Sequence, residues 1–111
     1  MNWQPLTTLA QLDTIAERSS LVPCLIFKHS TRCNISSIAK YRLESDWNFP
    51  DGQVEAYFLD LIAHREVSTA VSVRFSVHHE SPQVLLIHQG ECVLDASHLD
   101  ISVDEIQEVL G

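Results

Sequence analysis

Two short apolar segments joined by a helical one constrain the fold of this chain more than any other feature. Residues 21–28 and 54–61 are rich in aliphatic and aromatic side chains and have the length of buried strands. The segment between them, 33–46, carries apolar residues near helical spacing, at Ile35, Ile38, Ala39 and Leu43. Because strand–helix–strand crossovers join parallel strands with a right-handed turn, the pattern predicts an α/β domain.

The remaining segments extend this unit at both ends. Thr8 and Gln11 resemble a capping box that opens a helix to about Arg18, and Ser102 with Glu105 resembles another before a helix to Leu110. A third helix is expected over 64–75, after the Pro50-Asp51-Gly52 turn and the strand at 54–61. Strands at 84–88 and 92–96 flank Gln89-Gly90-Glu91, which predicts a hairpin. Residues 1–111 are therefore expected to form one thioredoxin-like domain, with a four-stranded mixed sheet flanked by helices.

Composition limits the number of domains and the cellular compartment expected for this chain. The sequence has 111 residues, is 45% hydrophobic and contains no run of 18 apolar residues, so it suits one core without a membrane span. Its start, Met1-Asn-Trp-Gln-Pro, lacks the pattern of a signal peptide. The three cysteines include no CxxC pair, which favours a reducing compartment over a disulfide scaffold. We therefore expect a cytoplasmic protein.

The charge is unevenly distributed along the sequence. A net charge of −8 disfavours nucleic acids and anionic membranes as partners, because both would be repelled. From Arg18 to Arg42, however, there are five basic residues and no acidic one, so this segment carries +5 and the rest −13. Cys33 lies within it. The pattern predicts a locally positive surface that favours thiolate and attracts a small anion, although chance spacing explains five scattered charges equally well.

Cys33 is the candidate nucleophile, because it lies where the strand at 21–28 has ended and a helix begins. First-turn N–H groups of a helix and its dipole stabilise thiolate over thiol. Ser81-Pro82 precedes the strand at 84–88, where an X-Pro bond can be cis and close over a site. If this strand runs antiparallel to the strand at 21–28, Ser81-Pro82 and Cys33 meet at one end of the sheet. Cys24 and Cys92 then lie at the other end, too far away to resolve an adduct on Cys33.

Two further motifs are Thr31-Arg-Cys-Asn-Ile-Ser36 and Val77-His-His-Glu-Ser-Pro-Gln83. Together they resemble the monothiol bacilliredoxin family, the thioredoxin-like proteins of the bacillithiol system. The resemblance implies that Cys33 takes bacillithiol, the co-substrate, from protein mixed disulfides, with Pro82 beside it and no bound cofactor. Its partners would be bacillithiolated client proteins, a low-molecular-weight thiol, and a reductase or dithiol protein. One position departs from the family pattern, because Asn34 stands where a proline is usual and brings a backbone donor near the sulfur.

The positions around Cys33 supply the other candidate site residues. Ser36 stands where a second cysteine would be, so no internal disulfide can form there. Its hydroxyl either donates to the Cys33 thiolate or is an ordinary first-turn serine. Arg32 adds a positive charge or is simply an exposed loop residue. The remaining predicted substrate contacts are Thr31, Asn34, Ser81, Pro82 and His79.

The six histidines are the other residues that can bind a metal. The adjacent His78-His79-Glu80 lack the spacing of zinc ligands, so no metal site is predicted. These histidines either lie on a surface loop or lie beside the Cys33 pocket. Two further functions remain open: a redox-sensing or binding module without turnover, and an iron–sulfur carrier of the monothiol glutaredoxin type that uses Cys33 and an external thiol as ligands.

Overall fold

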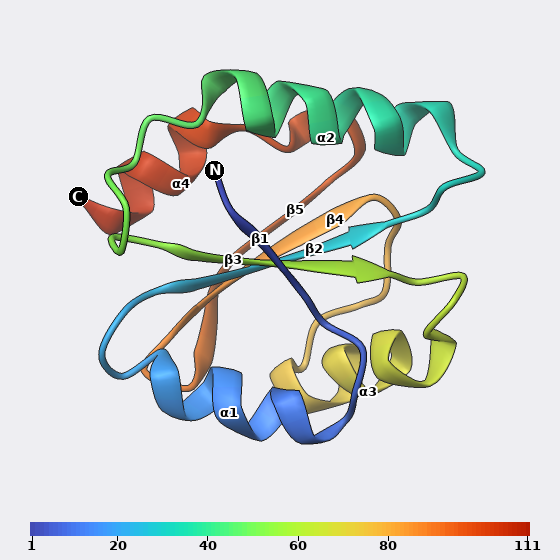
Figure 1. The fold of residues 1–111 in the computed structure, drawn as a ribbon, viewed down its shortest axis with the longest axis horizontal. Helices are drawn as coiled ribbons and strands as arrows, with labels where there is room; N and C mark the ends of the chain where they lie inside the picture. The colour runs from blue at the N-terminus through green and yellow to red at the C-terminus, as the bar shows by residue number, and fades with distance from the viewer.

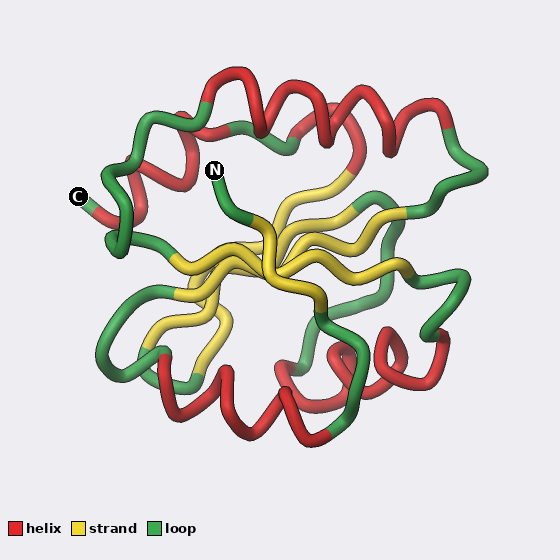
Figure 2. Tube along the Cα trace, viewed as in Figure 1, coloured by secondary structure: helices red, strands yellow, loops and turns green.

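The computed structural model describes residues 1–111 as a five-stranded sheet between two pairs of helices. Figure 1 shows α2 and α4 on one face of the sheet and α1 and α3 on the other, and Figure 2 shows the strands as the middle layer. The elements in chain order are β1 (Trp3–Pro5), α1 (Ala10–Arg18), β2 (Cys24–His29), α2 (Asn34–Asp46), β3 (Glu55–Asp60), α3 (Arg65–Phe75), β4 (Gln83–His88), β5 (Glu91–Ser97), a short 3₁₀ turn (His98–Asp100) and α4 (Val103–Leu110).

The sheet is mixed, with strand order β1-β3-β2-β4-β5. Strand β1 is parallel to β3, and β2 is parallel to β3 as the crossover through α2 requires. Strand β4 is antiparallel to β2, with Lys28 opposite Gln83 and Cys24 opposite Ile87. The predicted direction of β4 is therefore confirmed, and the end of β2 lies beside the start of β4.

The central strand β2 is buried on both faces, and its alternation divides the core in two. Cys24 and Ile26 face α1 and α3, whereas Leu25 and Phe27 face α2 and α4. Every residue of β2 is buried, including Lys28 and His29 at its end. Two titratable side chains thus enter the core from opposite faces at the end of the sheet that carries the Cys33 loop.

The prediction of four strands was wrong, because a fifth strand, β1, lies at the edge beside β3. It has only three residues and includes Pro5. Proline lacks an N–H group and is compatible with an edge strand, where one side of the ladder has no partner. Neither alternation nor length distinguishes such a segment from a loop in the sequence.

Several element ends also differ from the sequence prediction. Strand β2 begins at Cys24 rather than Leu21, because the N–H groups of Leu21 and Val22 still bond to the Arg18 carbonyl in a turn. At α1 only half of the capping box forms: Gln11 Oε1 accepts from the Thr8 N–H at 3.0 Å, while the N-cap is Leu9. The other cap is confirmed, since Ser102 Oγ accepts from the Glu105 N–H at 3.2 Å. No helix combines the length and apolar character needed to cross a membrane.

Candidate active site

Cys33 is the N-cap residue of α2, so the helix begins at Asn34, one residue after the predicted start at Cys33. Its backbone is extended, its N–H donates to the Ser30 carbonyl at 3.2 Å, and its side chain is half-buried. The first helical hydrogen bond runs from the Ser37 N–H to the Cys33 carbonyl. The N–H groups of the three residues between them therefore have no partner within the helix and lie at the end that carries the thiol.

The loop before β4 lies at the same end of the sheet. The Ser81–Pro82 peptide bond is cis, and the Lys28–Gln83 register places Pro82 next to the last residue of β2. The Gln83 side chain holds this loop, because its Nε2 donates to the His78 carbonyl at 2.9 Å and its Oε1 accepts from the Glu80 N–H at 3.4 Å. Ser81 Oγ is buried without a hydrogen-bond partner. Ser81-Pro82 and Cys33 are thus brought to one end of the sheet, as expected.

Ser36 is fully buried, and its hydroxyl contacts His29 rather than Cys33. Ser36 Oγ lies 2.7 Å from His29 Nδ1 and accepts from the Ser30 N–H at 3.0 Å. Burial, followed by the nearby Lys40 charge, lowers the pKa of His29, so its ring is neutral at pH 7 and Nδ1 can accept the Ser36 proton. The hydroxyl is therefore satisfied within the fold, where it ties the end of β2 and the Ser30 backbone to the first turn of α2.

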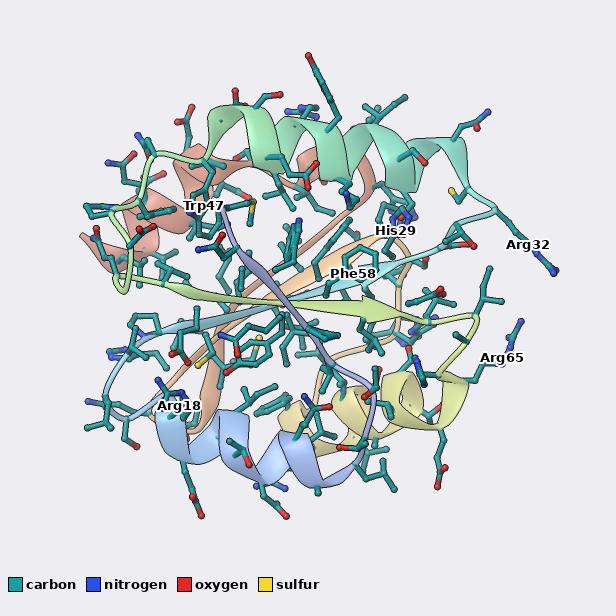
Figure 3. The ribbon with its side chains drawn as sticks, viewed as in Figure 1. Arg18, His29, Arg32, Trp47, Phe58 and Arg65 are labelled. Carbon is teal, nitrogen blue, oxygen red and sulfur yellow. The ribbon has the colours of Figure 1, made fainter.

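His29 packs in an aromatic cluster beneath the Cys33 loop. Its ring centroid lies 5.2 Å from that of Phe58 and 5.7 Å from that of Phe27. Figure 3 shows His29 and Phe58 near the end of β2, with Arg32 projecting from the loop beyond them. These contacts fix the strand end from which the Cys33 loop leaves.

The predicted basic patch around Cys33 forms only in part. Arg18 lies at the opposite end of the molecule from Arg32, where it forms an ion pair with Glu55 (Figure 3). Lys40 pairs with Glu44, and Arg42 donates to the Leu99 carbonyl. The prediction of one patch was wrong because β2 carries the chain from one end of the sheet to the other, which separates neighbours in sequence.

The other predicted contacts are mostly exposed. Thr31, Arg32 and Asn34 are exposed around the half-buried thiol. His79 is also exposed on the loop before Ser81-Pro82, but its Nδ1 lies 3.2 Å from the Nζ of buried Lys28. His79 therefore faces the α3 side of the sheet, whereas Cys33 begins the helix on the other side.

Cys24 and Cys92 lie at the far end of the sheet, as expected. Cys24 begins β2 and pairs with Ile87, which in turn pairs with Cys92 of β5. Burial and then the Glu55 carboxylate raise the pKa of Cys24 to about 12, and burial and then Asp95 raise that of Cys92 to about 11. The strand between Cys24 and His29 spans about 16 Å, far beyond disulfide reach. All three thiols are free.

Sequence reasoning missed two residues of this end of the sheet, Lys28 and His29. The sequence pattern predicts Lys28 as the end of a strand and His29 as the start of a loop. The signal that could have identified them is a lysine and a histidine continuing an apolar strand that a parallel crossover buries on both faces. His78, His79 and Glu80 do not form a metal cluster, and no other group of three His, Cys, Asp or Glu side chains gathers.

This arrangement supports one kind of thiol chemistry. A half-buried thiol at a helix N-terminus can attack a disulfide and hold one half of it as an adduct. Serine one turn further along cannot displace that adduct, and the other cysteines cannot reach it. Release therefore requires a second thiol from outside the chain.

Comparisons with known proteins agree with this geometry. The sequence model of the family described as monothiol bacilliredoxin BrxC matches residues 4–106. A thioredoxin-fold protein assigned as an oxidoreductase has 25% identity and a TM-score of 0.82, covering 96% of this chain and 92% of that one. Thioredoxins of Trypanosoma brucei brucei and Malassezia sympodialis have 13% and 14% identity and TM-scores of 0.76 and 0.75, each covering 98% of this chain and 88% of the other.

Proposed function

This chain belongs to the monothiol bacilliredoxin family, and we propose that it removes bacillithiol from protein mixed disulfides through Cys33. The observation that carries the proposal is the contrast among its thiols. Cys33 is half-exposed at a helix N-cap, while Cys24 and Cys92 lie in strands at the far end with strongly raised pKa values. One cysteine is thus available for exchange, in a fold that redox proteins use.

In the first step, the Cys33 thiolate attacks the bacillithiol sulfur of the mixed disulfide. The client's sulfur–sulfur bond breaks, and the client leaves as a thiolate that takes a proton from solvent. A new disulfide joins Cys33 to bacillithiol, so one disulfide is exchanged for another without net oxidation. The first N–H groups of α2, which have no partner within the helix, lie at the helix end that carries Cys33 and favour negative charge there.

In the second step, an external thiol regenerates Cys33. A second bacillithiol, as thiolate, attacks the bacillithiol sulfur of the adduct and leaves as bacillithiol disulfide, while Cys33 returns to a thiolate. A reductase or a dithiol protein can supply the thiol instead. Bacillithiol is therefore a co-substrate, no bound cofactor takes part, and the reducing cytoplasm is the compartment that suits this cycle.

The exposed residues around the sulfur are the proposed substrate contacts. Arg32 supplies a positive charge for an anionic thiol, and Thr31 and Asn34 supply polar groups on either side of Cys33. Across the site, the Ser81-Pro82 backbone presents the edge along which a client's extended chain would lie. Buried Ser36 has a positioning role, through His29 and the Ser30 N–H.

The test is transfer of the cap, followed by intact-protein mass spectrometry. The reduced protein is mixed with a bacillithiol-capped client, and the masses of both proteins are followed with time. We expect the wild type and a Cys92→Ala control to remove the cap and carry it transiently, and a Cys33→Ala variant to do neither. A client that stays capped with the wild type would contradict the proposal.

Added bacillithiol separates turnover from sensing. If the Cys33 adduct is released by free bacillithiol and the client pool is fully uncapped by a substoichiometric amount of protein, the protein is catalytic. If the adduct persists and only one client is uncapped per molecule, the thiol acts as a sensor instead.

A further inference from the structure

Lys28 is a fully buried lysine without an acidic partner. It lies on the α3 side of β2 and is 0% exposed. Its Nζ donates to Ser72 Oγ at 2.8 Å and lies 3.2 Å from His79 Nδ1, and it takes part in no ion pair. Burial lowers its pKa to about 8, so the amine is still mostly protonated at pH 7. A buried cation without an anion is costly, which points to a missing counter-charge.

A cavity lies where such a counter-charge would bind. It has a volume of about 290 Å³ and is bounded by α3, Leu61 and the loop before Ser81-Pro82. Its polar lining consists of Arg65, Ser68, Thr69, Ser72 and His79. Ser72 and His79 are the two partners of Lys28, so the cavity and the buried amine share the same polar groups.

The lining also contains a hydroxyl that nothing in the fold satisfies. Ser68 is 4% exposed, and its Oγ is buried without a hydrogen-bond partner. A buried hydroxyl without a partner is uncommon and indicates a group that completes the site. Arg65 is exposed at the rim and forms no ion pair. Hydroxyl donors, a guanidinium and a buried ammonium together match a carboxylate.

The cavity opens at the Cys33 end of the molecule. The Leu61 N–H donates to the His29 carbonyl at 3.0 Å, and His79 is two residues before Ser81. In Figure 3, Arg65 at the start of α3 and Arg32 in the Cys33 loop project from the same end. A small molecule with its sulfur at Cys33 would therefore have this cavity on the α3 side of the same edge.

We propose that this cavity binds a carboxylate of the small thiol that caps Cys33, held by Arg65 and the Ser68 hydroxyl above the Lys28 ammonium. This inference rests on the proposed function for its choice of ligand, although binding of the carboxylate needs no thiol chemistry. Thr69, Ser72 and His79 provide the remaining polar contacts. The pocket would select anionic thiols over neutral ones.

The first test uses succinate, a dicarboxylate without sulfur, and NMR of the reduced protein. We expect saturable shifts of the Ser68, Thr69 and Ser72 amides in the wild type. Arg65→Gln should weaken binding by at least about fivefold, the loss of roughly 1 kcal/mol for one charged contact, and Lys28→Met should weaken it further. The matched control is Arg74→Gln, an exposed arginine on the same helix that pairs with Asp13, which should leave the affinity unchanged.

The second test compares two small disulfides that differ in charge, dithiodiglycolate and hydroxyethyl disulfide. Arg65→Gln should slow the formation of the Cys33 adduct with the anionic dithiodiglycolate and leave the neutral reagent unaffected. If the carboxylate comes instead from a client side chain, Arg65→Gln will slow the reaction of Cys33 with capped clients but not with either small reagent. That result would overturn the assignment to the small thiol.

The two proposals fail separately. Absence of saturable shifts, or equal shifts in wild type, Arg65→Gln and Lys28→Met, would overturn the pocket even if the client is uncapped. Saturable binding that depends on Arg65, in a protein that leaves the client capped, would retain the anion pocket and overturn bacillithiol removal.

Discussion

The two ends of the sheet place cysteine side chains in opposite environments. At one end, the half-exposed Cys33 lies before the first turn of α2, whose first N–H groups have no partner within the helix. At the other, the Cys24 thiol lies in a buried strand, 3.4 Å from the Val22 carbonyl and 3.9 Å from a Glu55 carboxylate oxygen. Burial and a nearby negative charge keep that thiol protonated. Position in the secondary structure, rather than the presence of a thiol, decides which cysteine can react.

The buried charges extend this contrast. At the Cys33 end, Lys28 and His29 enter the core with hydroxyl and imidazole partners and lowered pKa values. At the far end, Arg18 and Glu55 satisfy each other as an ion pair. The charges at the far end neutralise each other, whereas the Cys33 end retains hydrogen-bond donors and the Lys28 cation, to which a ligand can bind.

The largest expected difference between the ends is in alkylation by iodoacetamide at neutral pH. With a pKa of about 12, Cys24 has a thiolate population on the order of one molecule in 100,000. We expect Cys33 to be modified at least about a hundredfold faster than either Cys24 or Cys92, as read by peptide mapping over time. In urea all three should react at similar rates. If Cys92 in the folded protein were modified as fast as Cys33, the proposed difference in thiol reactivity between the two ends would be wrong.

The next effect is the pH dependence of stability at Lys28. Its folded pKa of about 8 lies below the ordinary 10.5, so between these values the unfolded chain binds more protons and unfolding free energy rises with pH. The shift corresponds to roughly 3 kcal/mol. The advantage in unfolding free energy of Lys28→Met over the wild type should therefore shrink by about this amount from neutral pH to pH 10.5. If urea titrations show that the difference in unfolding free energy between Lys28→Met and the wild type is constant over this range, Lys28 is not a buried charge.

A smaller effect is expected from the serine that joins β2 to α2. Ser36→Ala leaves the Ser30 N–H and His29 Nδ1 without their partner, which should lower the unfolding free energy by about 1–3 kcal/mol. Ser37→Ala, at the adjacent exposed position, is the matched control and should change stability by less than about 0.5 kcal/mol. Equal stabilities of the two variants would show that the buried hydroxyl does not hold the Cys33 loop.

The smallest expected effect separates packing from chemistry. Cys24→Ala removes a buried sulfur and should cost about 1 kcal/mol in unfolding free energy without changing the rate at which Cys33 forms an adduct. Because the folded pKa of Cys24 is raised, its contribution to stability is complete below pH 9.0 and is lost as the pH rises toward 12. The cost of the substitution should fall over the same range. A slower Cys33 reaction in this variant would contradict the separation of the two ends.

Local sequence signals predicted the parts of the site that depend on chain neighbours. The strand end before Cys33, the cis-prone Ser81-Pro82 and the Ser102 cap each follow from a few adjacent residues. The antiparallel direction of β4 then followed from topology and brought Pro82 to the Cys33 end.

The parts that could not be predicted depend on direction and facing. Arg18 is close to Cys33 in sequence, yet the strand between them places Arg18 at the far end of the sheet. Lys28 and His29 are adjacent, but the alternation of β2 sends one toward α3 and the other toward α2. Strand β1 has only three residues, and it is recognisable as a strand only through its pairing with β3.

The most direct test of the account is to locate the adduct. The reduced protein is treated with one equivalent of bacillithiol disulfide, quenched with acid and mapped by peptide mass spectrometry without reduction. We expect one bacillithiol on the peptide that contains Cys33, with Cys24 and Cys92 unmodified and no internal disulfide. Bacillithiol on either of the other two cysteines, or a disulfide between Cys33 and one of them, would contradict it.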